Sequence, residues 1–171
     1  MREVKKSCDV VVVGKAIRKM MHIPAIMYGR TVVTTSESNI TKLQRIENRI
    51  WRFLLGIGGY STVEALRGEI GASMVKFRIM ETSLGYILDV MNGEFDELKK
   101  MMLDAIEEKR GKWFFHVERY RMELDISWKD LLKLDKKSLK KLIRNYDNEC
   151  WEKELGDKPE ARFYRMEKKG N

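Results

Sequence analysis

The sequence predicts an all-α protein in which a helical bundle is followed by a helical C-terminal extension. Apolar residues recur mainly every three or four positions, which is the spacing of one face of an α-helix. The 171 residues include only two prolines, and glycines stand between the apolar-periodic segments, where helices are expected to end. Hydrophobic residues make up 43% of the chain, which at this length is enough to build a core.

The N-terminal part of the chain is the hardest to assign. Residues 1–13 form an ambiguous leader, because the four valines at 10–13 favour a strand but lack the alternation of a half-buried one. No other segment is a plausible strand. From Gly14 to Tyr28 the apolar spacing is helical, and Pro24 is expected to kink or interrupt that helix because it has no backbone N–H to donate.

Residues 40–54 carry the clearest amphipathic pattern. The apolar positions expected to face inward include Leu43, Ile46, Ile50 and Phe53. Candidates for the N-cap of this helix are Thr34, Thr35, Ser36 and Ser38. Gly56 is expected to end the helix, since glycine adopts the left-handed conformation of a helix exit with the least strain.

Three further helices are expected before residue 110. Thr62 caps a short one over residues 64–69 that ends at Gly71, and Ser73 caps the next, which ends at residues 92–93. The third covers residues 94–109. Its apolar positions, expected to face inward, are Phe95, Leu98, Met101, Met102, Ala105 and Ile106.

After Gly111 the pattern predicts helices over residues 113–124 and 136–155, a helix start at Ser127, and a last helix beginning at Pro159. The expected organisation is therefore a leader over residues 1–13, a helical bundle over 14–92 and a helical extension over 93–171.

The net charge is 34 − 26 = +8, which makes a polyanionic partner plausible without identifying it. Cys8 and Cys150 belong to no CxxC spacing, so neither a zinc site nor a disulfide framework is indicated. The sequence contains no apolar stretch of membrane-spanning length, and the start resembles no signal peptide. We expect an intracellular protein, nuclear or cytoplasmic, without a membrane anchor.

Catalytic motifs are missing from the sequence. Polymerases hold two metal ions with carboxylates, usually on adjacent aspartates, and the chain has no Asp-Asp pair. Gly14-Lys15 lacks the rest of a phosphate-binding loop, and no serine lies in a nucleophile-elbow motif. His22 and His116 stand at no ligand spacing. We expect no enzymatic activity, no metal and no cofactor.

The candidate nucleic-acid-binding residues are a row of cations on the helix at residues 40–54. Lys42, Arg45, Arg49 and Arg52 follow one another in steps of three, four and three. Such steps place them on one helix face, where they could lie against a phosphate backbone without contacting bases. The alternative is an ordinary solvated face.

A second basic cluster and a set of aromatic residues could also contact nucleic acid, but the sequence supports these two groups less strongly. A second basic cluster comprises Lys133, Lys136, Lys137, Lys140, Lys141 and Arg144, and acids follow it directly, so ordinary ion pairing is the preferred explanation. Five aromatic residues could stack bases, but their helical spacing favours a place in the core. These are Trp113, Phe114, Phe115, Trp128 and Trp151.

Several motifs follow one another along the chain: Tyr28-Gly29; then Leu43-Gln44, Asn48, Arg52 and Gly56; then the segment 62–71; and finally Ser127-Trp128, Trp151 and Tyr164-Arg165. Their order resembles the region after the palm in reverse transcriptases of non-LTR (LINE-type) retrotransposons. Met27 replaces a commoner leucine, a tryptophan is missing at Val32 or Val33, and fingers, palm and endonuclease are absent.

The resemblance implies a thumb-like bundle over residues 14–92 that grips a template–primer duplex, followed by a linker. The leader would then be a remnant of the palm edge. The leading hypothesis is a non-catalytic C-terminal fragment of an RNA-directed DNA polymerase, whose missing partners are the palm and fingers. The alternative is a helical protein-interaction module whose basic face meets an acidic partner, and a third interpretation is a stand-alone DNA-binding protein.

Overall fold

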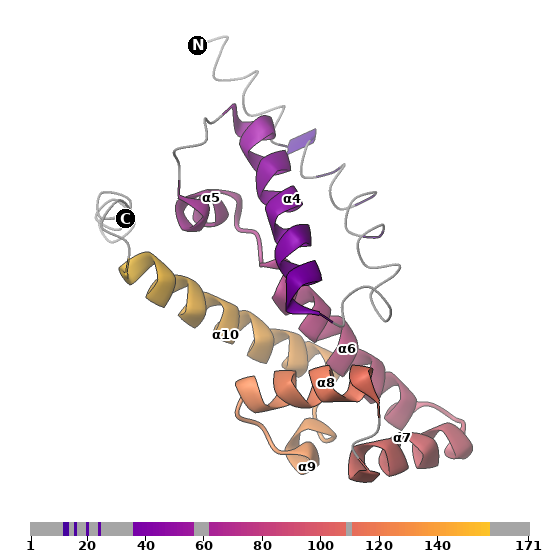
Figure 1. Cartoon of the computed structure of the whole chain (residues 1–171). Coiled ribbons are helices and arrows are strands. Elements are labelled where there is room, and N and C mark those ends of the chain that lie inside the picture. Colours follow the sequence, from indigo (N-terminus) through magenta and orange to yellow (C-terminus); the bar gives the residue numbers. More distant parts are fainter. Residues whose placement is uncertain are drawn as a thin grey trace. The chain divides into compact units, whose positions relative to one another are not determined.

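The computed structural model describes residues 36–56, 62–108 and 111–157, together with the single positions 12, 13, 16, 20 and 24. Helices, turns and short connections make up these residues, with no strand among them, so the all-α prediction is confirmed (Figure 1). Val12 and Val13 are helical, so the strand considered at residues 10–13 does not form at these two positions. The predicted helix at Pro159 and most of the one at residues 14–28 lie outside the described residues.

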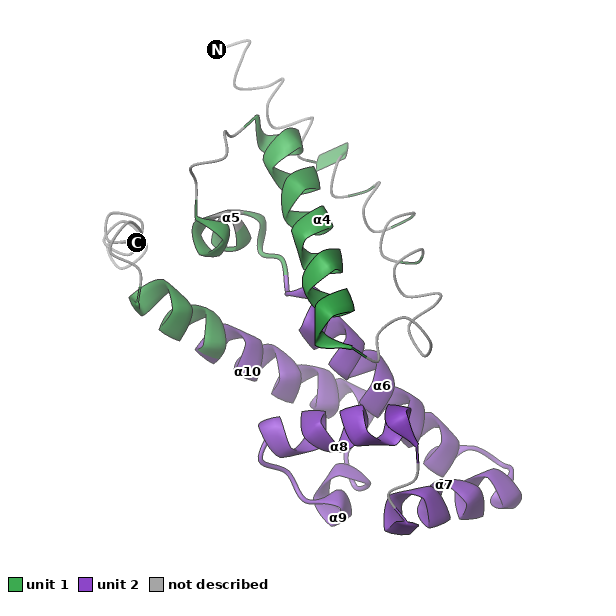
Figure 2. Ribbon diagram, viewed as in Figure 1, with its two compact units in different colours: residues 1–72, 150–171 green, residues 73–149 purple. Residues whose placement is uncertain are grey.

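The chain divides into two compact units, coloured separately in Figure 2. Unit 1 consists of residues 1–72 and 150–171, and unit 2 of residues 73–149. The predicted division between a bundle and an extension at residues 92–93 falls inside unit 2, at the turn between its first two helices.

Unit 1 contains α4 (Glu37–Leu55), α5 (Val63–Ile70) and the last residues of α10 (Lys136–Gly156). Trp51 of α4 and Ile70 of α5 form its buried apolar cluster, against which Leu54, Leu55 and Ala72 pack.

The C-terminal turns of α10 attach to α5 through polar contacts. The indole Nε1 of Trp151 donates to the backbone oxygen of Glu64 at 2.8 Å. The buried Arg67 forms an ion pair with Glu154, with 3.3 Å between Nη1 and Oε2. Segments almost ninety residues apart in the sequence are thus joined in one unit.

Unit 2 is built around α6 (Val75–Asn92), which packs against α7 (Asp96–Glu108) and α8 (Lys112–Glu123). The short α9 (Trp128–Leu131) and the first part of α10 complete the unit. Its largest fully buried apolar side chains are Val75, Ile79, Met80, Leu84, Ile87, Leu88, Phe114, Val117, Tyr120, Leu131 and Leu139. The ring of Phe77 meets that of Tyr146 edge-on, with 5.7 Å between centroids, which links α6 to α10.

Most predicted helix ends are confirmed. Ser36 is the N-cap of α4, and its hydroxyl accepts a hydrogen bond from the backbone N–H of Asn39 at 3.2 Å. Gly56 ends α4 in the left-handed region, with φ of 64°. Thr62 caps α5 as predicted. The predicted cap at Ser73 is wrong, because Met74 occupies the N-cap of α6 and makes no side-chain cap bond.

The start of α10 is capped by a carboxylate. Asp135 Oδ1 accepts a hydrogen bond from the backbone N–H of Ser138 at 3.0 Å. Hydrogen bonding by the Ser138 side chain and then by its backbone lowers the pKa of Asp135. A negative charge at this position also favours the helix, because it stands at the positive end of the helix dipole.

Candidate nucleic-acid interface

The basic row of α4 is mostly exposed. Lys42, Arg45 and Arg49 are exposed side chains, whereas Arg52 is half-buried. Within residues 36–56, 62–108 and 111–157, none of the three exposed cations forms an ion pair, while Arg52 makes interactions of its own. The prediction placed four cations on one face, and in the structure three of them are exposed and the fourth is half-buried.

The opposite side of α4 is held by a mixed apolar and polar face. Its buried residues are Ile40, Glu47, Asn48 and Trp51. The Gln44 side-chain amide donates to Asn48 Oδ1 at 2.9 Å, so part of this face is polar and internally bonded. With Trp51 anchored against Ile70, the cations that lie away from Trp51 on the helix are turned outward.

The predicted inward positions of α4 are wrong in part. Ile46 is 48% exposed and Phe53 is 84% exposed, while Leu43 and Ile50 are half-buried. Trp51 lies on a different face from these four residues, and the face with Trp51 is the buried one. Leu43, Ile46, Ile50 and Phe53 together form an apolar stripe beside the basic row, here called the α4 stripe, which is exposed at Ile46 and Phe53 and half-buried at Leu43 and Ile50.

The predicted inward positions of α7 are also wrong in part, because this helix has no fully buried residue. Met102, Ala105 and Ile106 are half-buried, as expected of residues that face a neighbouring helix. Phe95, Leu98 and Met101, which were expected inside, are 71%, 49% and 66% exposed. An amphipathic pattern predicts a helix and its apolar side, but it does not say how much of that side a neighbour covers.

Three lysines of the second basic cluster are engaged in ion pairs. Lys133 pairs with Asp130 at 3.4 Å, Lys136 with Asp89 at 2.5 Å, and Lys140 with Glu81 at 3.5 Å. Ion pairing, the preferred explanation of this cluster, therefore holds for these three lysines. Their partners lie on α9 and α6, however, and not among the acids that follow in α10. Lys137, Lys141 and Arg144 are exposed.

The aromatic residues proposed for stacking mostly have structural contacts. Phe114 is buried and stacks on Trp128, with centroids 5.5 Å apart and an interplanar angle of 18°. Trp113 meets Tyr86 edge-on at 6.0 Å, and Trp151 is bonded to α5. Phe115 is the exception, because it is 67% exposed.

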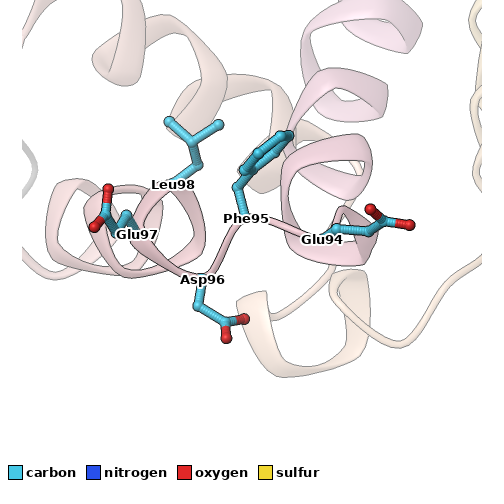
Figure 3. Close-up of a pocket in the computed structure, with 5 residues that line it drawn as sticks. All are labelled: Glu94, Phe95, Asp96, Glu97 and Leu98. Atoms are coloured by element: carbon cyan, nitrogen blue, oxygen red, sulfur yellow. The ribbon is translucent and has the colours of Figure 1, made fainter.

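Sequence inspection missed an open cavity at the start of α7. Its volume is about 350 Å³, and Glu94, Phe95, Asp96, Glu97 and Leu98 line it (Figure 3). In the sequence, two apolar residues stand among three acids there, but the segment was interpreted only as a helix start. The region is called the acidic corner below.

No other chemistry is assembled in the described part of the chain. No three His, Cys, Asp or Glu side chains gather there as metal ligands would. None of the described helices combines the length and apolar character needed to cross a bilayer. Cys150 is a free, half-buried thiol, and Cys8 and His22 lie outside the described residues.

Comparisons of the chain with protein-family models, with curated proteins and with solved structures gave no match.

Proposed function

We propose that the chain is the non-catalytic C-terminal part of a non-LTR retrotransposon RNA-directed DNA polymerase, and that α4 contacts a nucleic-acid duplex. The observation that carries the proposal is the exposure of Lys42, Arg45 and Arg49 on one helix face with no ion pair among the described residues. The motif order of the sequence supplies the family, and the palm and fingers of such a polymerase are the proposed protein partners.

The chemistry of the row suits a sugar–phosphate backbone. Cations spaced one helical turn apart neutralise successive phosphates and release counterions, which gives binding that is strong at low salt and indifferent to base sequence. Lysines and arginines that contact phosphates, and not base edges, position a duplex without reading its sequence. The proposed role is therefore to hold a duplex. The proposed site of action is intracellular, in the nucleus or cytoplasm.

Fluorescence anisotropy with a labelled RNA:DNA hybrid tests the duplex contact. In the K42Q/R49Q double variant, affinity should fall equally for two hybrids of unrelated sequence. The slope of log affinity against log salt should shrink by about one unit per lost phosphate contact. The matched control is K137Q/R144Q, which removes two exposed cations of α10 at the same seven-residue spacing and should leave the slope unchanged.

Folding of both variants is checked by circular dichroism. If K42Q/R49Q is folded and binds with wild-type affinity and salt slope, the row is only a solvated face. If both double variants weaken binding to the same extent, the contact is a property of net charge and not of α4.

Absence of catalysis is part of the proposal. Purified chain with magnesium, nucleotides and a primer–template should give no primer extension, because the sequence has no adjacent aspartates to hold the two metal ions. Extension that survives stringent purification and exceeds the no-protein control would contradict it.

A second candidate function is a protein-interaction module, and one observation favours it. Ile46 and Phe53 are exposed immediately beside the basic row, and a phosphate backbone offers no apolar surface to cover them. A partner with both apolar and acidic groups would match this side of α4. Such a partner should compete with the RNA:DNA hybrid in the anisotropy experiment.

A further inference from the structure

The α4 stripe has the form of a docking helix. Leu43, Ile46, Ile50 and Phe53 follow one another in steps of three, four and three, so they line one side of α4 over successive turns. Among the described residues, Phe53 is the most exposed large hydrophobic side chain, at 84%. Arg49 stands one turn before it on the neighbouring face, so an aromatic anchor and a cation are presented together.

The acidic corner of unit 2 has the opposite character. Phe95 and Leu98 project to the same side of the backbone in Figure 3, and the carboxylates of Glu94 and Glu97 spread on either side of them. Asp96 points away and accepts a hydrogen bond from Lys99 at 2.9 Å. The cavity volume of about 350 Å³ lies at the lower end of the roughly 300–1,000 Å³ typical of ligand pockets, so it has room for an aromatic side chain.

We propose that the α4 stripe of one molecule docks on the acidic corner of a second copy of this chain. Phe53 would enter the cavity beside Phe95 and Leu98, while the cations of the basic row would face Glu94 and Glu97. Apolar anchors at helical spacing in an apolar recess, with charges of opposite sign around them, are the recognition mode of a helix bound in a groove. The chain itself carries both complementary surfaces, which is why a second copy is the occupant.

The geometry makes this association head-to-tail. The two surfaces differ, so each molecule that docks through α4 still offers its own acidic corner, and each that docks through the corner still offers α4. Pairing of α4 with another α4 is disfavoured, because it would bring two rows containing Lys42, Arg45 and Arg49 together. The expected products are open chains or a closed ring, with association that weakens as salt rises.

Sedimentation analysis of the full chain without nucleic acid tests the proposal independently of duplex binding. Phe53→Asp disables the α4 stripe and Phe95→Lys disables the acidic corner, and both residues are exposed enough for the fold to tolerate the change. The wild type should show a mass that rises with concentration beyond that of a dimer. Each variant alone should stay monomeric, while an equimolar mixture should form a dimer and stop there, because that pair retains one usable interface.

Phe115→Asp is the matched control, since Phe115 is another exposed phenylalanine, on α8, outside both surfaces. It should associate as the wild type does. The proposal is overturned if the wild type stays monomeric over the whole concentration range, if Phe53→Asp still associates, or if the mixture of the two variants stays monomeric. Pairing of like surfaces would instead appear as association of one variant alone, Phe95→Lys for α4 with α4 or Phe53→Asp for corner with corner. Circular dichroism checks that each variant is folded.

Discussion

The assignment of the buried face of α4 can be tested by two alanine substitutions. Trp51 is 3% exposed and packs on Ile70, whereas Phe53, two residues later, is 84% exposed. Trp51→Ala removes a buried aromatic ring, and such changes typically lower the free energy of unfolding by about 3–5 kcal/mol. That is a large share of the total for a domain, which is about 5–15 kcal/mol.

The cost of Phe53→Ala follows from its exposure. Full burial of a phenylalanine contributes about 1.5–3 kcal/mol, and only the 16% of Phe53 that is not exposed gains from it, which gives about 0.2–0.5 kcal/mol. The apolar pattern of the sequence placed Phe53 inward and made no assignment for Trp51. The structure predicts that Trp51→Ala lowers the free energy of unfolding by about 3 kcal/mol more than Phe53→Ala does.

Urea unfolding followed by circular dichroism measures both variants, at the lowest practical protein concentration so that self-association does not contribute. Trp51→Ala should move the midpoint far to lower urea, and Phe53→Ala should leave it almost unchanged. Equal losses for the two variants, or a larger loss for Phe53→Ala, would refute the orientation of α4 described above.

Three further predictions concern stability. Trp151→Phe keeps an aromatic ring but loses the indole N–H that donates to the Glu64 carbonyl, and should cost about 1 kcal/mol in urea unfolding. Gly56→Ala places a side chain at φ of 64° and should cost about 1–2 kcal/mol, whereas Gly85→Ala, inside α6 with open space around the new Cβ, should raise stability by about 0.5–1 kcal/mol. Asp135→Asn should lower stability at neutral pH, because a lowered pKa means that the ionised carboxylate stabilises the fold above its unfolded pKa. The difference from wild type should vanish as pH falls through the folded pKa, and a difference that persists in acid would contradict this.

Helix ends were predictable from the sequence because their causes are local. A hydroxyl at Ser36 or Thr62 satisfies the first free backbone N–H groups, and a glycine at position 56 or 71 accepts the left-handed exit, whatever the rest of the chain does. The exposure of Lys42, Arg45 and Arg49 was predictable for a similar reason, since burying an unpaired charge is costly.

The burial of particular faces was not predictable in the same way. The face of α4 that is buried includes Glu47 and Asn48, which a hydrophobicity pattern assigns to solvent. Such residues can be buried only where hydrogen bonds satisfy them, and that depends on neighbours that the pattern does not contain. The size of Trp51 was the one available signal, because a tryptophan covers more area than any of the stripe residues.

Helix α10 gives the chain an order of events during its synthesis. Unit 2 is a continuous segment, so all of it has left the ribosome once residue 149 has emerged. Unit 1 is discontinuous, because the segment 150–171 belongs with residues 1–72, and α5 must wait for Trp151 and Glu154 before its polar contacts can form. Domains generally fold as their segments emerge, and closing such a loop costs entropy that only the finished contacts offset. The α4–α5 segment is therefore synthesised before unit 2 but can complete its contacts only after unit 2 has been made.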